Sequence, residues 1–149
     1  MLEDISALEN CTVSSVPDGY DAFLLAQLWE KSDRDILYIV SDGVALENTA
    51  HILSVIRPEA EVLKFPAWDT VPYDRVSPNV NIVAARIGAL NALAQNPSPK
   101  KPRIIVTSAG AAIQRLPLKK IFLNSMKNVS VGGELNFNDF VHYAVSAPI

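Results

Sequence analysis

Three short apolar runs, separated by stretches with helical spacing, dominate the pattern of hydrophobic and polar positions along the chain. Ile36–Val40 is a nearly continuous apolar run, Glu61–Phe65 is a second strand candidate, and Arg103–Ser108 is rich in β-branched residues. A run such as Ile36–Val40 is typical of a strand that is buried on both faces. Because strands and helices alternate in order, the pattern predicts an α/β fold with a parallel sheet and right-handed crossovers.

The predicted helices lie between these strands. Ser41-Asp42-Gly43 supplies N-cap candidates for a helix that Pro58 ends, and its buried stripe should be Leu46, Ala50, Leu53 and Ile56. Ser77-Pro78 suits the start of a helix that runs to about Ala94, with Val80, Val83, Ile87 and Leu90 on one face. A short helix is predicted over Ala111–Gln114.

The last part of the chain has a different pattern. Lys127–Val131 is compatible with a further strand, Gly132-Gly133 with a turn, and Asn136–Val145 with a short helix. Nothing in the sequence closes this unit, which therefore resembles a truncated fragment. We expect two domains, 1–126 and the start of another at 127–149.

Composition restricts the class of function. The chain has 149 residues, 49% of them hydrophobic, and a net charge of −3. It therefore lacks the basic balance of a module that binds nucleic acid by itself. The single cysteine, Cys11, is expected to be a small buried residue, and with two scattered histidines it predicts no metal site. No apolar run is long enough to span a membrane, so a cytoplasmic protein without membrane contact is expected.

The segment from Ser15 to Ala22 lies where a nucleotide-binding α/β protein would carry its phosphate loop. The G-x-x-x-x-G-K-[ST] loop wraps phosphates with backbone N–H groups, and its lysine and hydroxyl serve the phosphates and magnesium. On that template Ser15 and Tyr20 replace the glycines, Asp21 the lysine and Ala22 the hydroxyl residue, with Gly19 beside them. This alignment predicts a degenerate site without a cofactor. The alternative is that Pro17-Asp18-Gly19 is simply a turn.

The irregular stretch after the second strand offers aromatic and acidic side chains. Trp68 and Tyr73 could stack on bases or a partner, but packing of the proline-rich stretch against the sheet is the simpler role. Asp69 and Asp74 have no acid–base or metal partner in the pattern, so solvent exposure or helix capping is expected for them.

Three stretches together resemble the bacterial transcription-repair coupling factor (Mfd) family. They are Val16–Gly19 with Ala22–Ala26, Phe65–Pro78, and Ile105–Ser108 with Ala112–Pro117. The resemblance implies the N-terminal, UvrB-like region of a large DNA translocase, with a P-loop-NTPase-like (helicase lobe) fold. The stretch between the second strand and the next helix is too short for the DNA-separating hairpin of UvrB.

The resemblance also implies partners and roles. The parent removes stalled RNA polymerase from damaged duplex DNA and recruits excision repair through UvrA, which the adjacent second domain would contact. ATP and Mg²⁺ would serve a downstream motor. In two-lobed helicases the segment after a strand such as Arg103–Ser108 touches the DNA backbone, which makes Thr107, Ser108 and Arg115 the DNA-contact candidates; other cations considered are Arg75, Arg86, Lys119 and Lys120.

The function expected from all this is a non-catalytic scaffold or regulatory lobe that contacts the other domains of its parent. Two alternatives remain open at this point. The chain could be a nucleotide-binding, helicase-like ATPase domain, or it could be a DNA-binding module.

Overall fold

The computed structural model describes residues 10–70, 76–95, 100–127 and 129–146. The chain forms two compact units, Met1–Gln114 and Arg115–Ile149, which are treated separately below. The two units are defined by their internal contacts. The domain boundary expected at residue 126 stays a prediction.

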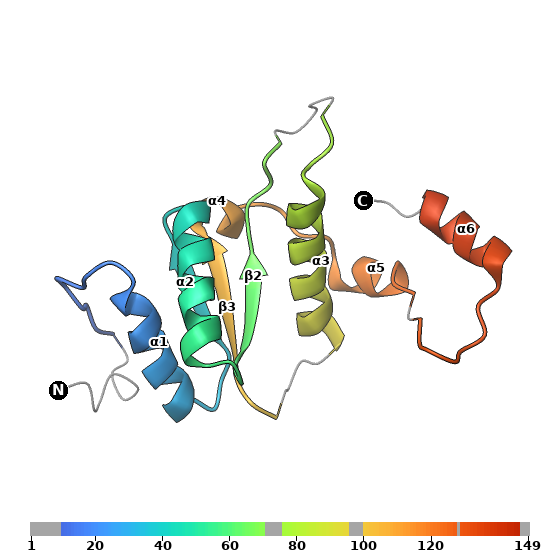
Figure 1. Cartoon of the computed structure of the whole chain (residues 1–149). Coiled ribbons are helices and arrows are strands. Elements are labelled where there is room, and N and C mark those ends of the chain that lie inside the picture. Colours follow the sequence, from blue (N-terminus) through green and yellow to red (C-terminus); the bar gives the residue numbers. More distant parts are fainter. Residues whose placement is uncertain (1–9, 71–75, 96–99, 128, 147–149) are drawn as a thin grey trace. The chain divides into compact units, whose positions relative to one another are not determined.

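A three-stranded parallel sheet forms the centre of the first unit (Figure 1). Its strands are β1 (Ile36–Val40), β2 (Glu61–Phe65) and β3 (Arg103–Ser108), in the spatial order β1-β3-β2. Ile36 pairs with Ile104, and Glu61 pairs with Arg103. Every residue of β3 is buried, because this strand has a neighbour on each side and helices against the sheet. The predicted strands and the parallel α/β class are confirmed. The expected burial of β1 on both faces is wrong, because β1 is an edge strand whose Leu37 and Ile39 are exposed. A P-loop-NTPase-like fold stays a prediction.

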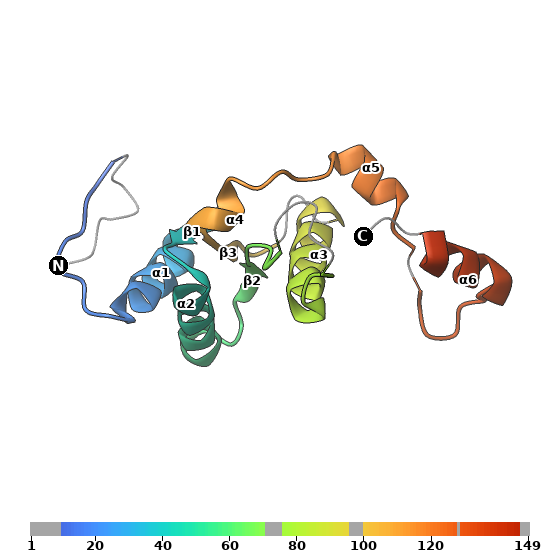
Figure 2. The same ribbon diagram turned by 90° about the horizontal axis from the view of Figure 1, so that it is seen from above.

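Two helices cover one face of the sheet. They are α1 (Tyr20–Lys31) and α2 (Gly43–Ile56), which lie side by side in Figures 1 and 2. Asp42 caps α2 as predicted, since its carboxylate accepts hydrogen bonds from the backbone N–H groups of Val44 and Ala45. The main core joins both helices to the sheet; its buried members are Ala22, Leu25, Ala26, Trp29, Val40, Leu46, Leu53, Ile104 and Val106.

The helix α3 (Val80–Gln95) packs against the other face of the sheet, where Ile105, the residue between Ile104 and Val106, belongs to a second core cluster. The buried face of α3 differs from the predicted one. Arg86 and Ala89 are buried, whereas Val80 and Ile87 are exposed. Leu90 of the predicted stripe packs against the second core cluster, but the most buried positions are Ala89 and Arg86, whose guanidinium lies over the Phe65 ring.

The start of α3 also differs from the prediction. Asn79, and not Ser77, has the capping role: its side-chain Oδ1 accepts from the backbone N–H of Asn81 (2.9 Å) and its carbonyl from that of Val83 (3.0 Å). The backbone N–H of Asn79 in turn donates to the Asp69 carboxylate (3.2 Å). Asp69 therefore stabilises the approach to the helix, in line with the capping role expected for it.

The short helix α4 (Ala109–Ala112) follows β3 without a break, two residues before its predicted start. Ser108 causes this early start, because its hydroxyl accepts from the backbone N–H of Ala111 (3.3 Å).

The second unit contains the helices α5 (Lys119–Asn124) and α6 (Phe137–Ser146). The helix α6 confirms the predicted one, whereas α5 was not predicted. The strand predicted over Lys127–Val131 is wrong for the described residues 127 and 129–131, which pair with no strand. Instead, the backbone N–H of Gly133 bonds to the Ser130 carbonyl (3.1 Å) and Gly132 has a φ of 83°, which confirms the predicted glycine turn.

Candidate functional site

The loop that precedes α1 contains the residues that align with a phosphate loop. The backbone N–H of Tyr20 donates to the Pro17 carbonyl (3.0 Å), and Gly19 has a φ of 80° immediately before the helix. The segment is thus a tight turn that passes directly into α1. A phosphate loop connects a strand to a helix, but the described residues ahead of α1, 10–19, contain no strand. The turn interpretation of Pro17-Asp18-Gly19 therefore describes the observed backbone.

The positions that correspond to phosphate-binding residues have other tasks in the structure. Ala22 is fully buried in the core between α1 and the sheet, so its side chain does not face the loop. Tyr20 stacks on Phe23, with ring centroids 5.9 Å apart. Ser15 has a left-handed backbone conformation with a φ of 59°. Their identity as remnants of a phosphate site stays a prediction.

A cavity of about 390 Å³ lies between this loop, α2 and β1. Asp21 lines this cavity together with Tyr38 and Thr49, and its Oδ2 atom accepts from the Tyr38 hydroxyl (2.8 Å) and the Thr49 hydroxyl (3.2 Å). Burial, together with the neighbouring Asp21 carboxylate, raises the pKa of Tyr38 to about 12. Asp18 also lines the cavity. The described residues that line this cavity include no lysine or arginine. A cavity with two carboxylates repels a polyphosphate, because neither charge is offset by a cation.

The carboxyl end of β3 carries two of the DNA-contact candidates. The Thr107 hydroxyl donates to the Phe65 carbonyl (2.9 Å), and the Ser108 hydroxyl caps α4. Both residues are 3% exposed, so both side chains are committed to the interior. Arg115, the third candidate, is exposed and is the first residue of the second unit. Thr107 and Ser108 are close together because they are neighbours in the sequence. Contact of Thr107, Ser108 and Arg115 with DNA stays a prediction.

An arginine that was considered as a DNA contact is instead the centre of an interior cluster. Arg86 is 2% exposed, and its guanidinium carbon lies 4.1 Å from the centroid of the Phe65 ring and 4.4 Å from that of Trp68. Its Nη1 atom donates to the Pro66 carbonyl (2.6 Å) and to Oε1 of Gln114 (3.0 Å). Burial lowers the pKa of Arg86. The prediction that Arg86 could contact DNA is therefore wrong, because its side chain is buried.

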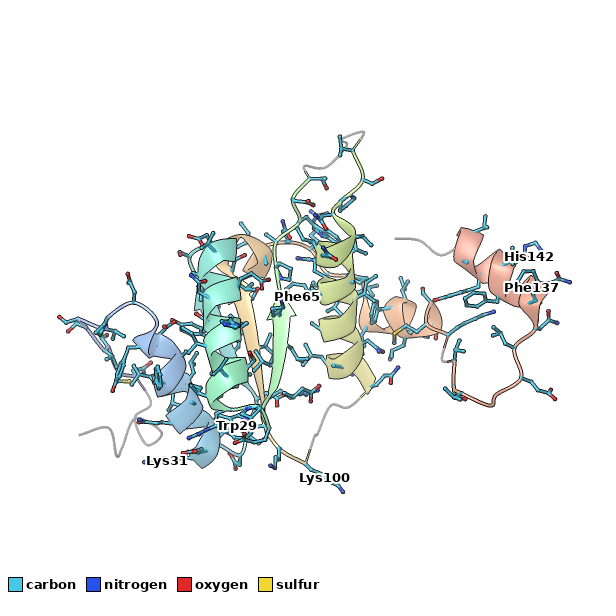
Figure 3. All side chains as sticks on the ribbon, in the orientation of Figure 1. Trp29, Lys31, Phe65, Lys100, Phe137 and His142 are labelled. Carbon is cyan, nitrogen blue, oxygen red and sulfur yellow. The ribbon has the colours of Figure 1, made fainter. Side chains whose placement is uncertain are left out.

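The same cluster confirms the packing role expected for Trp68. Its ring packs against the Arg86 guanidinium of α3, which also contacts Phe65 at the end of β2. Phe65 is labelled in Figure 3. The sequence analysis missed the pairing of Trp68 with Arg86. The available signal was that Arg86 is the only charged residue of the segment Val80–Gln95. Tyr73, Asp74 and Arg75 lie outside the described residues, and Lys119 and Lys120 are exposed.

A second buried cation joins the beginnings of two strands. Arg103 is 2% exposed and donates to the Asp35 carboxylate from its backbone N–H (2.8 Å), Nε (3.1 Å) and Nη2 (2.5 Å). Its Nη1 atom donates to the Ala92 carbonyl of α3 (3.0 Å). The hydrogen bond from the Arg103 side chain holds the pKa of Asp35 below its ordinary value. The arrangement is structural, since it fixes β1, β3 and α3 at one end of the sheet.

Other candidates give no further site within the described part of the chain. No group of three or more His, Cys, Asp or Glu residues there could hold a metal ion. Cys11 is exposed, so the expectation that it is buried is wrong; it lies ahead of α1, outside the packed elements. A search of the described helices finds none with the length and hydropathy needed to cross a membrane.

Comparison with known proteins gives a consistent result. A transcription-repair-coupling factor of Rickettsia bellii is 31% identical over 124 residues, which are 83% of this chain and 11% of that protein. The Rickettsia prowazekii protein of the same name is 41% identical over 58 residues, 39% of this chain and 5% of its own length. That of Haemophilus influenzae is 29% identical over 78 residues, 52% of this chain and 7% of its own length. No protein-family model and no solved structure matches the chain significantly.

The chain thus spans about a tenth or less of the length of the curated relatives that it matches. The likeness covers most of this chain, and relatives from two bacterial genera carry the same name. The shared name agrees with the family that the sequence resembles. The chain belongs to the transcription-repair-coupling factor family.

Proposed function

We propose that this chain is a nucleotide-independent scaffold lobe of a transcription-repair coupling factor. The observation that supports this most is the Asp21 carboxylate, which lines the cavity behind the turn before α1 and accepts hydrogen bonds from Tyr38 and Thr49. A negative charge fixed at the place of a phosphate-binding lysine opposes nucleotide binding. A lobe that binds no nucleotide has no ATP hydrolysis of its own, which is the sense in which this proposal calls it non-catalytic.

A lobe without chemistry can still orient its neighbours. The first unit is suited to this, because its central strand is buried along its length and the Arg103–Asp35 pair fixes one end of the sheet. A rigid sheet presents adjoining domains in a defined orientation and can hold a motor in a repressed state through domain contacts. In this proposal, UvrA binds through the adjacent second domain, which begins near residue 127. RNA polymerase, duplex DNA, ATP and Mg²⁺ are engaged by downstream domains of a cytoplasmic parent.

The nucleotide part of the proposal can be tested on the chain itself. Thermal unfolding of the first unit can be followed by tryptophan fluorescence, since Trp29 and Trp68 both lie in that unit. Millimolar ATP or ADP with Mg²⁺ is expected to leave the midpoint unchanged. A ligand at ~100 times its dissociation constant would add about 2.7 kcal/mol to the free energy of unfolding. A protective shift would overturn the nucleotide-independent role.

The variant Asp21→Lys sharpens this test. It replaces the repelling carboxylate with the cation that a phosphate loop requires, whereas Ala22 is left unchanged because it is buried in the core. We expect no ATP hydrolysis by this variant, since a side chain for magnesium is still missing. Asp21→Asn is the matched control for loss of the carboxylate alone, and turnover by either variant would show that a complete site exists.

The scaffold part requires the parent protein. Replacing the matching segment of the Haemophilus influenzae coupling factor with this chain should retain strand-specific repair, because a scaffold lobe supplies orientation rather than chemistry. A second chimera that carries Leu53→Asp in the core should lose it, since Leu53 is fully buried. If the first chimera is folded and abundant yet inactive, or if the second is fully active, the scaffold role is wrong.

A further inference from the structure

The cluster around Arg86 connects two parts of the first unit that are far apart in sequence. The segment 66–70, here called the strap, follows β2 directly, and Gln114 is the last residue before the chain enters the second unit. Oε1 of Gln114 accepts from the backbone N–H of Trp68 (3.1 Å) and from Nη1 of Arg86 (3.0 Å). One side-chain oxygen therefore holds the strap and the buried cation at the same time.

The described partners of the Arg86 guanidinium are all neutral. They are the rings of Phe65 and Trp68, the Pro66 carbonyl and the Gln114 amide oxygen. Removing a cation from water costs free energy, and ring faces and neutral oxygens offset that cost only while they are all in place. The lowered pKa of Arg86, caused by burial, agrees with this balance.

This balance makes the cluster cooperative. If the strap moves, the guanidinium loses the Trp68 ring and the Pro66 carbonyl, and water reaches it. Gln114 then loses its bond to the strap and shares its bond to Arg86 with solvent. The backbone of Gln114 also donates to the Ala111 carbonyl (3.1 Å), which ties the same residue to α4 at the end of β3.

We propose that Arg86 and Gln114 form a conformational relay that couples the position of the strap to the point where the chain leaves the first unit. Whatever displaces the strap releases Gln114, and whatever pulls on Gln114 loosens the strap. This reciprocity is a thermodynamic requirement of any such coupling. The relay does not depend on the nucleotide-independent role proposed above, because it involves none of the residues around Asp21.

Nuclear magnetic resonance of the whole chain can test the relay through amide hydrogen exchange and the side-chain N–H signals of Arg86. Gln114→Ala should speed exchange at the Trp68 amide and at the Arg86 guanidinium by about tenfold or more, the effect of losing a hydrogen bond to a charged group. Gln114→Glu should slow both, because a carboxylate then pairs with the buried cation. Trp68→Ala should shift the backbone signals of Gln114 and Arg115.

Two comparisons separate the relay from general loosening of the fold. Glu30→Gln weakens the surface pair with Arg57 and involves neither the strap nor Arg86 nor Gln114, so the signals of Gln114 and Arg115 should stay unchanged. Amides of β1 should keep their wild-type exchange in every variant. If Trp68→Ala does not fold, the two Gln114 variants still decide the matter. The relay is wrong if Gln114→Ala leaves Arg86 and Trp68 as in the wild type, or if Gln114→Glu gives the same rates as Gln114→Ala.

Discussion

The pair of Asp35 and Arg103 joins the beginnings of β1 and β3, and replacing Asp35 with asparagine measures what that junction contributes. Arg103 is 2% exposed and donates three hydrogen bonds to the Asp35 carboxylate, from its backbone N–H (2.8 Å), Nε (3.1 Å) and Nη2 (2.5 Å). Asparagine keeps the shape of the side chain but leaves the buried guanidinium without its counter-charge.

The expected cost follows from that burial. Breaking a buried ion pair by removing one partner lowers stability by roughly 3–5 kcal/mol. Because the Asp35 side chain is 28% exposed, water partly compensates for the loss, and we expect about 3 kcal/mol, the lower end of that range. The surface pair of Glu30 and Arg57 is the matched control: Glu30 is 50% exposed, so Glu30→Gln should cost at most about 1 kcal/mol.

Urea unfolding of the full chain, followed by tryptophan fluorescence, gives both free energies of unfolding from the midpoints and slopes. The pH dependence adds a second check. The pKa of Asp35 is lowered in the folded state, so its contribution is present above its unfolded pKa and is lost as the pH falls through the folded value. The difference between wild type and Asp35→Asn should therefore be constant near neutrality and shrink below about pH 4.

The reasoning would be refuted if Asp35→Asn and Glu30→Gln cost the same. It would also be refuted if the difference between wild type and Asp35→Asn persisted undiminished into strong acid. Either result would mean that Arg103 is held by its bond to the Ala92 carbonyl and by packing, and not by the carboxylate.

Two further predictions concern the cavity behind the turn before α1. In an alkaline absorbance titration, Tyr38 should ionise near its pKa of about 12, and Asp21→Asn should move this step to lower pH because the carboxylate no longer opposes a tyrosinate. An unchanged step would contradict the contact. Gly19→Ala should lower the free energy of unfolding by about 1–2 kcal/mol, since Gly19 has a φ of 80° and a new Cβ would lie 3.1 Å from Cδ1 of Ile52. Gly43→Ala is its control, because that position has open space and no positive φ, and equal losses in the two variants would contradict the strain argument.

Much of the fold was readable in the sequence. Ile36–Val40, Glu61–Phe65 and Arg103–Ser108 are strands with the predicted bounds, because short runs rich in β-branched and other apolar residues favour strands. Only β3, the central strand, is buried on both faces. The capping role of Asp42 was also predicted from the sequence, since helix capping depends on residues that are adjacent in the chain. The strand expected at Lys127–Val131 failed for the opposite reason: a strand needs a partner, and β propensity alone does not supply one.

The candidate site was less predictable, because its contacts join distant residues. The sequence showed that Asp21 could not act as a phosphate-binding lysine, but only the fold placed it against Tyr38 and Thr49. Likewise, Arg86 read as a surface cation until the packing of α3 placed it between two aromatic rings.

The sequence by itself thus determined the class of fold, the strand positions and the family, because these depend on local pattern and on ordered residue matches. The tertiary structure alone decided which polar groups are buried and with which partners. The physical reason is that the pKa and availability of a charged side chain depend on how far it is removed from water, and that depends on the packing of the whole unit.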